Sequence, residues 1–197
     1  MSPFTFANSS QSVPGEIELA VSFTIKADPS TDVWEKPPST RSFNAPILYR
    51  SMPLRAFKRA RVSVMAAWET LYDQGGLILV IHQTDGERKW IKAGIEYVQG
   101  KARLSVVAKD RWSDWSLVSI PSGGSTATIE MVREEDGSLW VYWIEGVQRV
   151  PLREVTWAFE QADSAHCWIG TFAARPSSPA DGGRLAVDFC HLVVDAE

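Results

Sequence analysis

Apolar and polar residues alternate over the stretch from residue 17 to residue 25. The odd positions hold isoleucine, leucine, valine and phenylalanine, and the even positions hold polar or small residues. Because successive side chains of a strand point to opposite faces, a period of two is typical of a strand with one buried face. The sequence therefore predicts a half-buried strand over residues 17–25.

Further segments with strand character follow along the rest of the chain. They comprise residues 58–68, 76–83, 89–98, 102–108, 112–120, 126–133, 138–145, 167–174 and 185–194. Turn residues such as Gln99-Gly100 separate many of them at intervals of about 8–12 residues, which is typical of a sandwich or barrel. Residues 153–162 fit either a short helix or a loop with one turn. The pattern as a whole predicts an all-β, antiparallel two-sheet sandwich with roughly ten to twelve strands.

Residues 28–46 interrupt this regularity with four prolines. Loops of this length inside a compact domain are usually functional or disordered. This one carries Asp32 and Trp34, and a tryptophan is hard to reconcile with disorder. We therefore expect the loop to pack back on the body of the domain.

Five basic residues lie between Arg50 and Arg61 with no acidic residue among them. Lysine and arginine commonly protect an exposed strand edge from pairing with another chain. The run is therefore interpreted as a solvated edge, with a patch that binds an anion as the alternative.

Length and composition restrict the class of protein. A chain of 197 residues suits one domain over residues 1–197, with a core from about residue 15 to residue 194. The net charge of −4 argues against a general nucleic-acid binder. No signal peptide and no apolar run of about 20 residues are present, so we expect a cytoplasmic protein that does not enter a membrane. Cys167 and Cys190 fit two buried reduced thiols, with a single bridge as the alternative.

The sequence lacks the motifs of common catalytic and cofactor sites. It has no nucleophile elbow, no phosphate-binding glycine loop and no dinucleotide fingerprint. Its three histidines are scattered, and neighbours in a strand, such as His166 and Cys167, point to opposite faces. We therefore expect neither a metal site nor a cofactor.

One face of the predicted strand 89–98 is unlike an ordinary surface. Trp90, Lys92, Gly94 and Glu96 share this face, and the opposite face is apolar. Tyr72 and Gln74 precede this strand, and Trp112 and Trp115 follow it at short distance along the chain. Aromatic rings beside amide and charged groups suit a groove that binds a sugar or another small polar ligand. A buried Lys92–Glu96 ion pair covered by indole rings explains the same residues as a purely structural network.

These segments resemble a known family. They are Tyr72-Asp73-Gln74-Gly75-Gly76-Leu77, Trp90-Ile91-Lys92-Ala93-Gly94-Ile95-Glu96, Leu104-Ser105-Val106-Val107 and Ser113-Asp114-Trp115-Ser116, together with Asp32-x-Trp34 and Phe189. In this order they resemble a microbial and fungal family of unknown-function domains with the concanavalin A-like lectin/glucanase fold. Some fungal members of that family are labelled for regulation of enolase. The resemblance covers roughly residues 15–194.

The resemblance implies a jelly-roll sandwich with a concave face, and it does not imply an enzyme. Glucanases of this fold carry a Glu-x-Asp-x-Glu or Glu-x-Asp-x-x-Glu strand, which this chain lacks. Glu96 is the only carboxylate in the candidate strand, because Lys92 and Gly94 occupy the positions where its partners would lie.

Three hypotheses for the function follow, and the first is preferred. It is a non-catalytic domain that binds a carbohydrate or similar polar ligand on its concave face. Its predicted ligand-binding residues are Asp32, Trp34, Tyr72, Gln74, Trp90, Lys92, Glu96 and Trp115, of which the aromatic ones stack and the others form hydrogen bonds. The second is a cytosolic regulatory or protein-interaction module that acts on a glycolytic enzyme such as enolase. The third is an atypical glycosidase or lyase that uses Glu96 with Asp32 or Asp73. Both a monomer and a homodimer fit the sequence.

Overall fold

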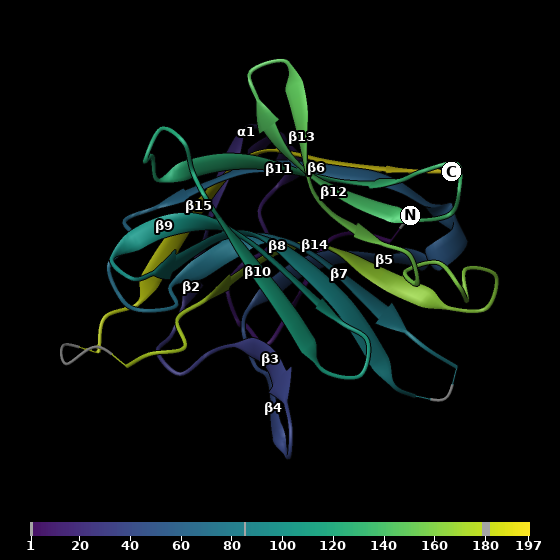
Figure 1. The fold of residues 1–197 in the computed structure, drawn as a ribbon, viewed down its shortest axis with the longest axis horizontal. Coiled ribbons are helices and arrows are strands. Elements are labelled where there is room, and N and C mark those ends of the chain that lie inside the picture. Colours follow the sequence, from purple (N-terminus) through teal and green to yellow (C-terminus); the bar gives the residue numbers. More distant parts are fainter. Residues whose placement is uncertain (1, 85, 179–181) are drawn as a thin grey trace.

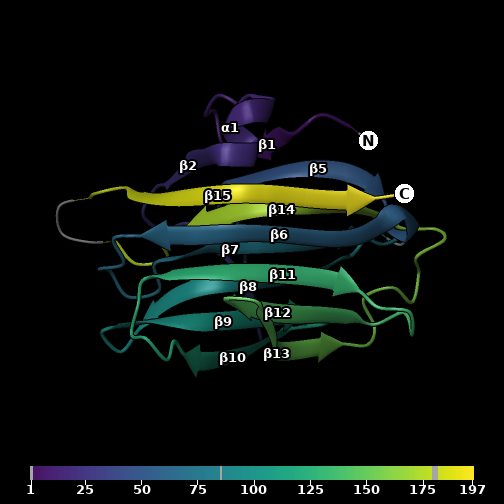
Figure 2. The same ribbon diagram turned by 90° about the horizontal axis from the view of Figure 1, so that it is seen from above.

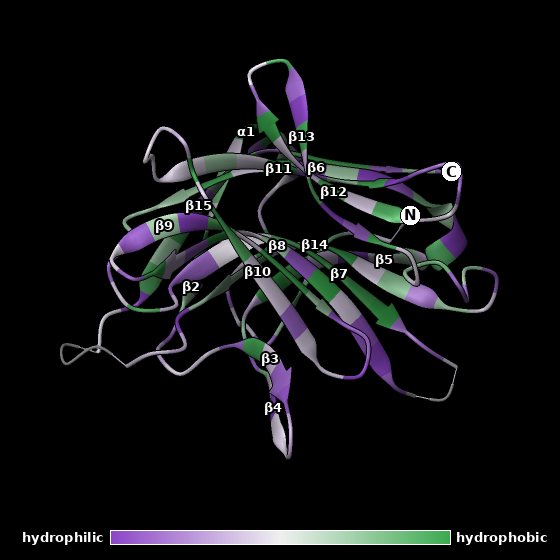
Figure 3. Ribbon diagram, in the orientation of Figure 1, coloured by the Kyte–Doolittle hydropathy of each residue, from purple (hydrophilic) through white to green (hydrophobic). Residues whose placement is uncertain are grey.

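The computed structural model describes residues 2–84, 86–178 and 182–197, and these residues form two large antiparallel sheets. Figure 1 shows the sheets as two layers, and Figure 2, seen from above, shows one layer lying over the other. The fold is thus the antiparallel two-sheet sandwich that the strand pattern predicted, of the jelly-roll type that the family resemblance implied. In Figure 3, hydrophobic and hydrophilic residues alternate along several of the strands.

The first sheet has seven strands in the order β1-β5-β14-β7-β8-β9-β10 among the described residues. Their bounds are Thr5–Ala7 for β1, Ile47–Pro53 for β5, Gln74–His82 for β7, Arg88–Val98 for β8, Lys101–Lys109 for β9, Ser113–Ser119 for β10 and His166–Ala174 for β14. The outer face of this sheet carries the candidate site.

The second sheet has six described strands in the order β13-β12-β11-β6-β15-β2. Their bounds are Ser22–Ala27 for β2, Phe57–Ala66 for β6, Thr126–Arg133 for β11, Leu139–Glu145 for β12, Gln148–Val155 for β13 and Leu185–Ala196 for β15. A short helix, α1 (Glu16–Val21), precedes β2, and a 3₁₀ turn, η1 (Leu54–Ala56), precedes β6.

The main core lies between the two sheets and consists of the apolar positions that alternate along the strands. Val62 and Val64 of β6 and Leu77 and Leu79 of β7 belong to it, and all four are fully buried. Burial of an aliphatic side chain of this size contributes about 1.5–3 kcal/mol. This layer therefore supplies the rigid support for the outer face of the first sheet.

The first predicted strand is partly wrong, because residues 16–21 form helix α1. The Glu18 carboxylate accepts a hydrogen bond from the Gly15 amide at 2.7 Å, and the Leu19 amide donates to the Gly15 carbonyl. These contacts stabilise the first turn of a helix. Within α1 only Leu19 is buried, and Ile17 is 81% exposed. The apolar alternation therefore reflects a strand only from Ser22 onwards.

The basic run between Arg50 and Arg61 does not mark a sheet edge. Strand β6 pairs with β11 on one side and with β15 on the other. Arg59 forms ion pairs with Glu130 at 3.3 Å and with Asp195 at 2.9 Å, and both partners come from neighbouring strands. The interpretation as a solvated edge is therefore wrong for β6.

Five of the described strands lie outside the predicted set, namely β1, β5, β13 and the two strands of a hairpin within residues 28–46. Strand β13 lies at the edge of the six-stranded sheet, and Pro151 interrupts its apolar alternation. Residues 156–164, which follow it, form turns rather than a helix.

Residues 28–46 contain a hairpin of β3 (Val33–Lys36) and β4 (Thr40–Phe43). Figure 1 shows this hairpin projecting from the outer face of the seven-stranded sheet. Val33 is fully buried, so the segment packs back on the body as predicted.

The described helices include none that is both long and apolar enough to cross a membrane. Both cysteines are free thiols, with Cys167 buried and Cys190 partly exposed.

Candidate functional site

A pocket of about 520 Å³ lies on the outer face of the seven-stranded sheet. It is lined by Asp32, Trp34, Lys36, Tyr72, Gln74, Lys92, Glu96, Trp115, Pro176 and Ser177. Seven of the eight residues that the sequence singled out are therefore brought together here. We call this cavity the outer-face pocket.

The strand register explains why these residues meet. In the β7–β8 pair, Gln74 lies opposite Glu96 and Ile78 lies opposite Lys92. Residues opposite each other in an antiparallel pair share a face, and so do residues two apart along a strand. Gln74, Lys92 and Glu96 consequently form the floor of the pocket.

A chain of polar contacts connects three residues of the pocket. The Lys92 ammonium donates to the Gln74 side-chain carbonyl at 2.6 Å, and the Gln74 amide donates to the Asp32 carboxylate at 3.3 Å. The Lys92 ammonium also lies 3.5 Å from the same Asp32 oxygen. Lys92 is only 3% exposed, so these contacts compensate for much of the loss of its hydration.

Glu96 has a separate set of contacts. Its carboxylate accepts a hydrogen bond from the Ser105 hydroxyl at 2.7 Å, and the Ser105 oxygen accepts one from the Trp115 indole at 3.0 Å. Burial raises the pKa of Glu96, while the charge of Lys92 and the Ser105 hydrogen bond oppose this rise. Lys92 pairs with Asp32 and Gln74 rather than directly with Glu96. The direct Lys92–Glu96 ion pair of the structural alternative is therefore not formed.

Three aromatic rings form the walls of the pocket. The Trp34 and Trp115 rings meet edge-on, with centroids 5.9 Å apart, and the Tyr72 and Trp115 rings do so at 6.3 Å. Tyr72 is 37% exposed and Trp34 and Trp115 are partly exposed. In an edge-to-face pair the edge of one ring covers one face of the other, and the partial exposure of all three rings leaves aromatic surface for a ligand.

Trp90 does not line the pocket, although the sequence placed it among the stacking residues. Its side chain is fully buried and belongs to a second apolar cluster with Ile78, Val80 and Phe172, on the outer face of the sheet. Val33, just before Trp34 in the β3–β4 hairpin, packs in the same cluster. The predicted stacking of Trp90 on a ligand is therefore wrong, because the segment 33–45 covers its ring.

A buried ion pair, Asp73–Arg175, lies next to residues that line the pocket. Arg175 donates from Nε and Nη2 to the two carboxylate oxygens of Asp73, at 2.7 and 2.8 Å. Asp73 is fully buried, and it lies between Tyr72 and Gln74 in the chain. Arg175 directly precedes Pro176, which forms part of the pocket rim. Because Asp73 is engaged in this pair and does not line the pocket, it does not fit the role of second carboxylate in a glycosidase.

Sequence reasoning missed Lys36, Pro176, Ser177 and the Asp73–Arg175 pair. Lys36 and the rim residues lie in the hairpin and in a connection, where alternation gives no information about direction. Arg175 lies 102 positions away from Asp73, and only the pairing of β7 with β14 brings them together. Among the residues described, no group of histidine, cysteine and acidic side chains could hold a metal ion.

The chain resembles known proteins over nearly its whole length. An uncharacterized protein of Emericella nidulans is 56% identical over 99% of this chain and 96% of its own length. Regulation of enolase protein 1 of Saccharomyces cerevisiae is 31% identical over 96% of this chain and 87% of its own. Among solved structures, a functionally unknown protein from Saccharomyces cerevisiae superposes with a TM-score of 0.77, at 28% identity, over 98% of this chain and 96% of that one.

A GH43 protein from Bacillus licheniformis superposes with a TM-score of 0.61 at 14% identity, over 89% of this chain and 33% of that one. This similarity extends to the fold alone, which is of the concanavalin A-like lectin/glucanase type. The model of one family, described as a protein of unknown function (DUF1349), matches residues 11–195. The chain therefore belongs to the DUF1349 family.

Proposed function

We propose that the protein binds a carbohydrate, or a polar ligand similar to one, in the outer-face pocket without turning it over. The observation that carries this proposal is the meeting of three partly exposed aromatic rings with a floor of hydrogen-bonding groups. The apolar C–H face of a sugar ring packs against Trp34, Tyr72 or Trp115. Its hydroxyl groups reach the polar floor of Gln74, Lys92 and Glu96.

The dimensions and chemistry of the pocket support the same proposal. Sites for small ligands usually enclose about 300–1,000 Å³ and combine apolar walls with a few fixed polar groups. Gln74 and Lys92 are held by contacts to each other and to Asp32, so their positions are set before a ligand arrives. Polar groups that are already oriented lose little conformational entropy on binding.

A glycan array combined with a thermal-shift screen of soluble sugars tests the proposal. We expect at least one sugar class to bind and to raise the unfolding temperature. Trp115→Ala should abolish the response, because it removes both a wall and the indole donor to Ser105. Trp140→Ala is the matched control, since Trp140 belongs to β12 of the other sheet and stacks on Tyr142.

The proposal fails if folded wild-type protein responds to no sugar in either screen. It also fails if Trp140→Ala weakens binding as much as Trp115→Ala does. Circular dichroism of each variant establishes that a lost response is not caused by unfolding.

The yeast relative suggests a second candidate function. Because Regulation of enolase protein 1 is 31% identical over 96% of this chain, a regulatory contact with a glycolytic enzyme in the cytosol is the alternative. Titration of purified enolase into the protein, followed by calorimetry, tests it. If Trp115→Ala still binds enolase, this role does not involve the outer-face pocket. If the wild-type protein does not bind enolase, ligand binding is left as the one candidate function.

A further inference from the structure

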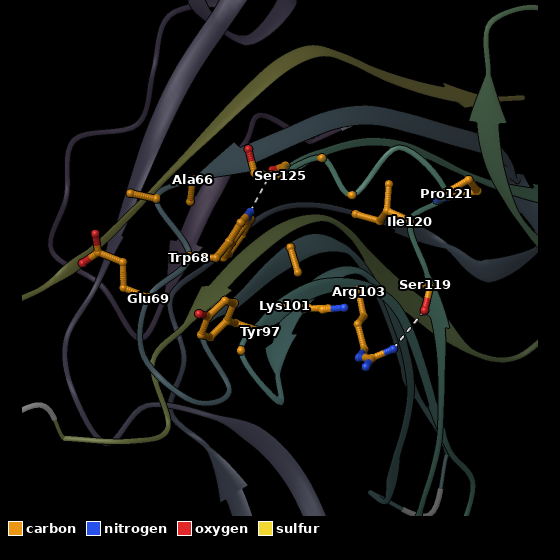
Figure 4. Close-up of a pocket in the computed structure, with 15 residues that line it drawn as sticks. Ala66, Trp68, Glu69, Tyr97, Lys101, Arg103, Ser119, Ile120, Pro121 and Ser125 are labelled. Atoms are coloured by element: carbon orange, nitrogen blue, oxygen red, sulfur yellow. Dashed lines mark hydrogen bonds between the residues drawn. The ribbon is translucent and has the colours of Figure 1, made fainter.

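A second and larger cavity, of about 620 Å³, lies at one end of the sandwich, where residues of both sheets meet. We call it the end cavity. It is bounded by the end of β6 and residues 67–69, by the β8–β9 turn, and by residues 119–125, which connect β10 to β11. Figure 4 shows the side chains that line it. The end cavity and the outer-face pocket have no lining residue in common.

Two flat rings give the end cavity an apolar wall. Trp68 is 7% exposed, and its indole donates to the Ser125 carbonyl at 2.8 Å. This contact fixes both the ring and the residue 119–125 segment, as the dashed line in Figure 4 shows. Tyr97 is partly exposed and presents the second ring. Ile120 and Ala102 contribute further apolar surface.

Two cations on β9 give the cavity a positive side. The Arg103 guanidinium donates to three neutral oxygens, those of Val98, Ser119 and Gln99, at 3.0–3.5 Å. A guanidinium has five N–H groups, so further donors remain and its charge is not neutralised by these contacts. Lys101 is exposed and forms no ion pair with any carboxylate of the residues described.

The one acidic residue of the lining is separated from these cations. In Figure 4, Glu69 lies on the opposite side of the view from Lys101 and Arg103, with the Trp68 and Tyr97 rings between them. A concave site with charge of one sign and apolar walls concentrates counter-ions of the opposite sign. The end cavity thus has an apolar middle and a cationic side.

We propose that the end cavity binds a small organic anion. The apolar or aromatic body of this ligand packs on Trp68 and Tyr97, and its carboxylate or phosphate group lies against Lys101 and Arg103. This site is separate from the outer-face pocket and does not depend on the function proposed for that pocket.

Titration with matched probes, followed by ¹H–¹⁵N NMR, tests this inference. Phenyl phosphate and benzoate supply a ring with an anionic group, phenol supplies the ring alone, and inorganic phosphate supplies the charge alone. We expect both ring-bearing anions to shift the Trp68 indole signal and the Lys101 and Arg103 amide signals, with a dissociation constant of roughly 1 mM or lower. Phenol and inorganic phosphate should each bind at least about tenfold more weakly. Whichever of phenyl phosphate and benzoate binds more tightly shows whether the cavity prefers a phosphate or a carboxylate group.

Lys101→Gln is the decisive variant, because Lys101 is exposed and its substitution should leave the fold intact. It should weaken the binding of phenyl phosphate about tenfold, as expected for one charge-assisted contact. Lys36→Gln removes the same charge from the outer-face pocket and should leave the affinity unchanged. Trp115→Ala should also leave it unchanged, which separates this test from the test of sugar binding.

Three outcomes would overturn the inference. The first is that neither phenyl phosphate nor benzoate shifts the NMR signals of Trp68, Lys101 and Arg103. The second is equal affinity for phenol and phenyl phosphate, which indicates apolar occupancy without recognition of charge. The third is an equal loss of affinity in Lys36→Gln and Lys101→Gln, which indicates an effect of net charge alone.

Discussion

Glu96 combines a buried carboxylate with only partial compensation of its charge. It is 6% exposed, and its strongest contact is the neutral hydroxyl of Ser105 at 2.7 Å. Burial disfavours the ionised form, and this effect exceeds the opposing influence of Lys92, so the pKa of Glu96 lies above its ordinary value of 4.5. A carboxyl group of this kind offers a sugar hydroxyl either a donor or an acceptor, according to pH.

The raised pKa of Glu96 predicts a pH-dependent effect of Glu96→Gln on stability. In the folded protein the neutral carboxyl is favoured, so the contribution of Glu96 to stability is full below pH 4.5 and is lost as the pH rises through the raised pKa. The free energy of unfolding of Glu96→Gln, relative to wild type, should therefore increase as the pH rises from 4.5. Urea unfolding at a series of pH values measures this difference, with the exposed Glu145→Gln as control for net charge. A difference that falls with pH would contradict the assignment.

The Asp73–Arg175 pair predicts a large loss of stability on removal of one charge. Asp73→Asn leaves the Arg175 guanidinium buried without its carboxylate, which typically costs about 3–5 kcal/mol. The control is Asp188→Asn, because Asp188 is exposed and accepts one hydrogen bond from Thr24 at 2.6 Å. That variant should lose less than about 1 kcal/mol. Chemical unfolding of both variants gives the comparison, and equal losses would show that the buried pair has no special importance.

Alternation in the sequence was enough to place Gln74, Lys92 and Glu96 on one face, because the period of a strand fixes the face of each side chain. It did not indicate how deeply each residue lies. Trp90 shares the face of Lys92, yet the segment 33–45 covers it. The cover depends on how a distant, proline-rich segment folds back, which local periodicity does not encode.

At the scale of elements, the close approach of β7 and β8 depends on glycines. Gly76 and Gly94 lie opposite each other in the two strands. A Cβ atom on Gly94 would lie 1.9 Å from the Gly75 carbonyl oxygen and 2.7 Å from the Gly76 Cα. Both obstacles are backbone, so neither moves without disturbing the register that aligns Gln74 with Glu96.

Gly94→Ala should therefore lower the free energy of unfolding by about 3 kcal/mol or more, since overpacking against backbone is at the upper end of such effects. Gly124→Ala is the control, because the nearest atom to its Cβ is the Ser122 hydroxyl oxygen at 3.1 Å, on a rotatable side chain. It should cost less than about 1 kcal/mol. Thermal and urea unfolding compare the two variants, and a mild effect of Gly94→Ala would mean that β7 and β8 adapt more readily than their geometry implies.

Element boundaries were predicted best where short turns separate neighbouring strands. The strands from β7 to β12 were recognised because turn residues separate clear apolar runs. Helix α1 was mistaken for a strand because Ile17 and Val21 extend the alternation of β2 although both are exposed. The hydrogen bond between the Gly15 amide and the Glu18 carboxylate stabilises the start of a helix there. A period of two in hydrophobicity carries no information about such a cap.

At the scale of the whole molecule, the two cavities use different parts of the sandwich. The outer-face pocket is built on the side of the first sheet that faces away from the main core. The end cavity lies where the two sheets separate, beside the β8–β9 turn and the segment that crosses from one sheet to the other. Turn spacing predicted the sandwich but could not locate the end cavity, because its lining comes from connections of both sheets.

Indole NMR signals test the proposed ligand site most directly, since the chain has nine tryptophans and each gives one indole N–H signal. The sugar that binds best on the glycan array would be titrated into ¹⁵N-labelled protein. We predict that the signals of Trp34 and Trp115 shift together in a saturable manner, while those of Trp68, Trp140 and Trp168 stay in place. Shifts confined to tryptophans outside the outer-face pocket, or none at all at saturating sugar, would contradict the account.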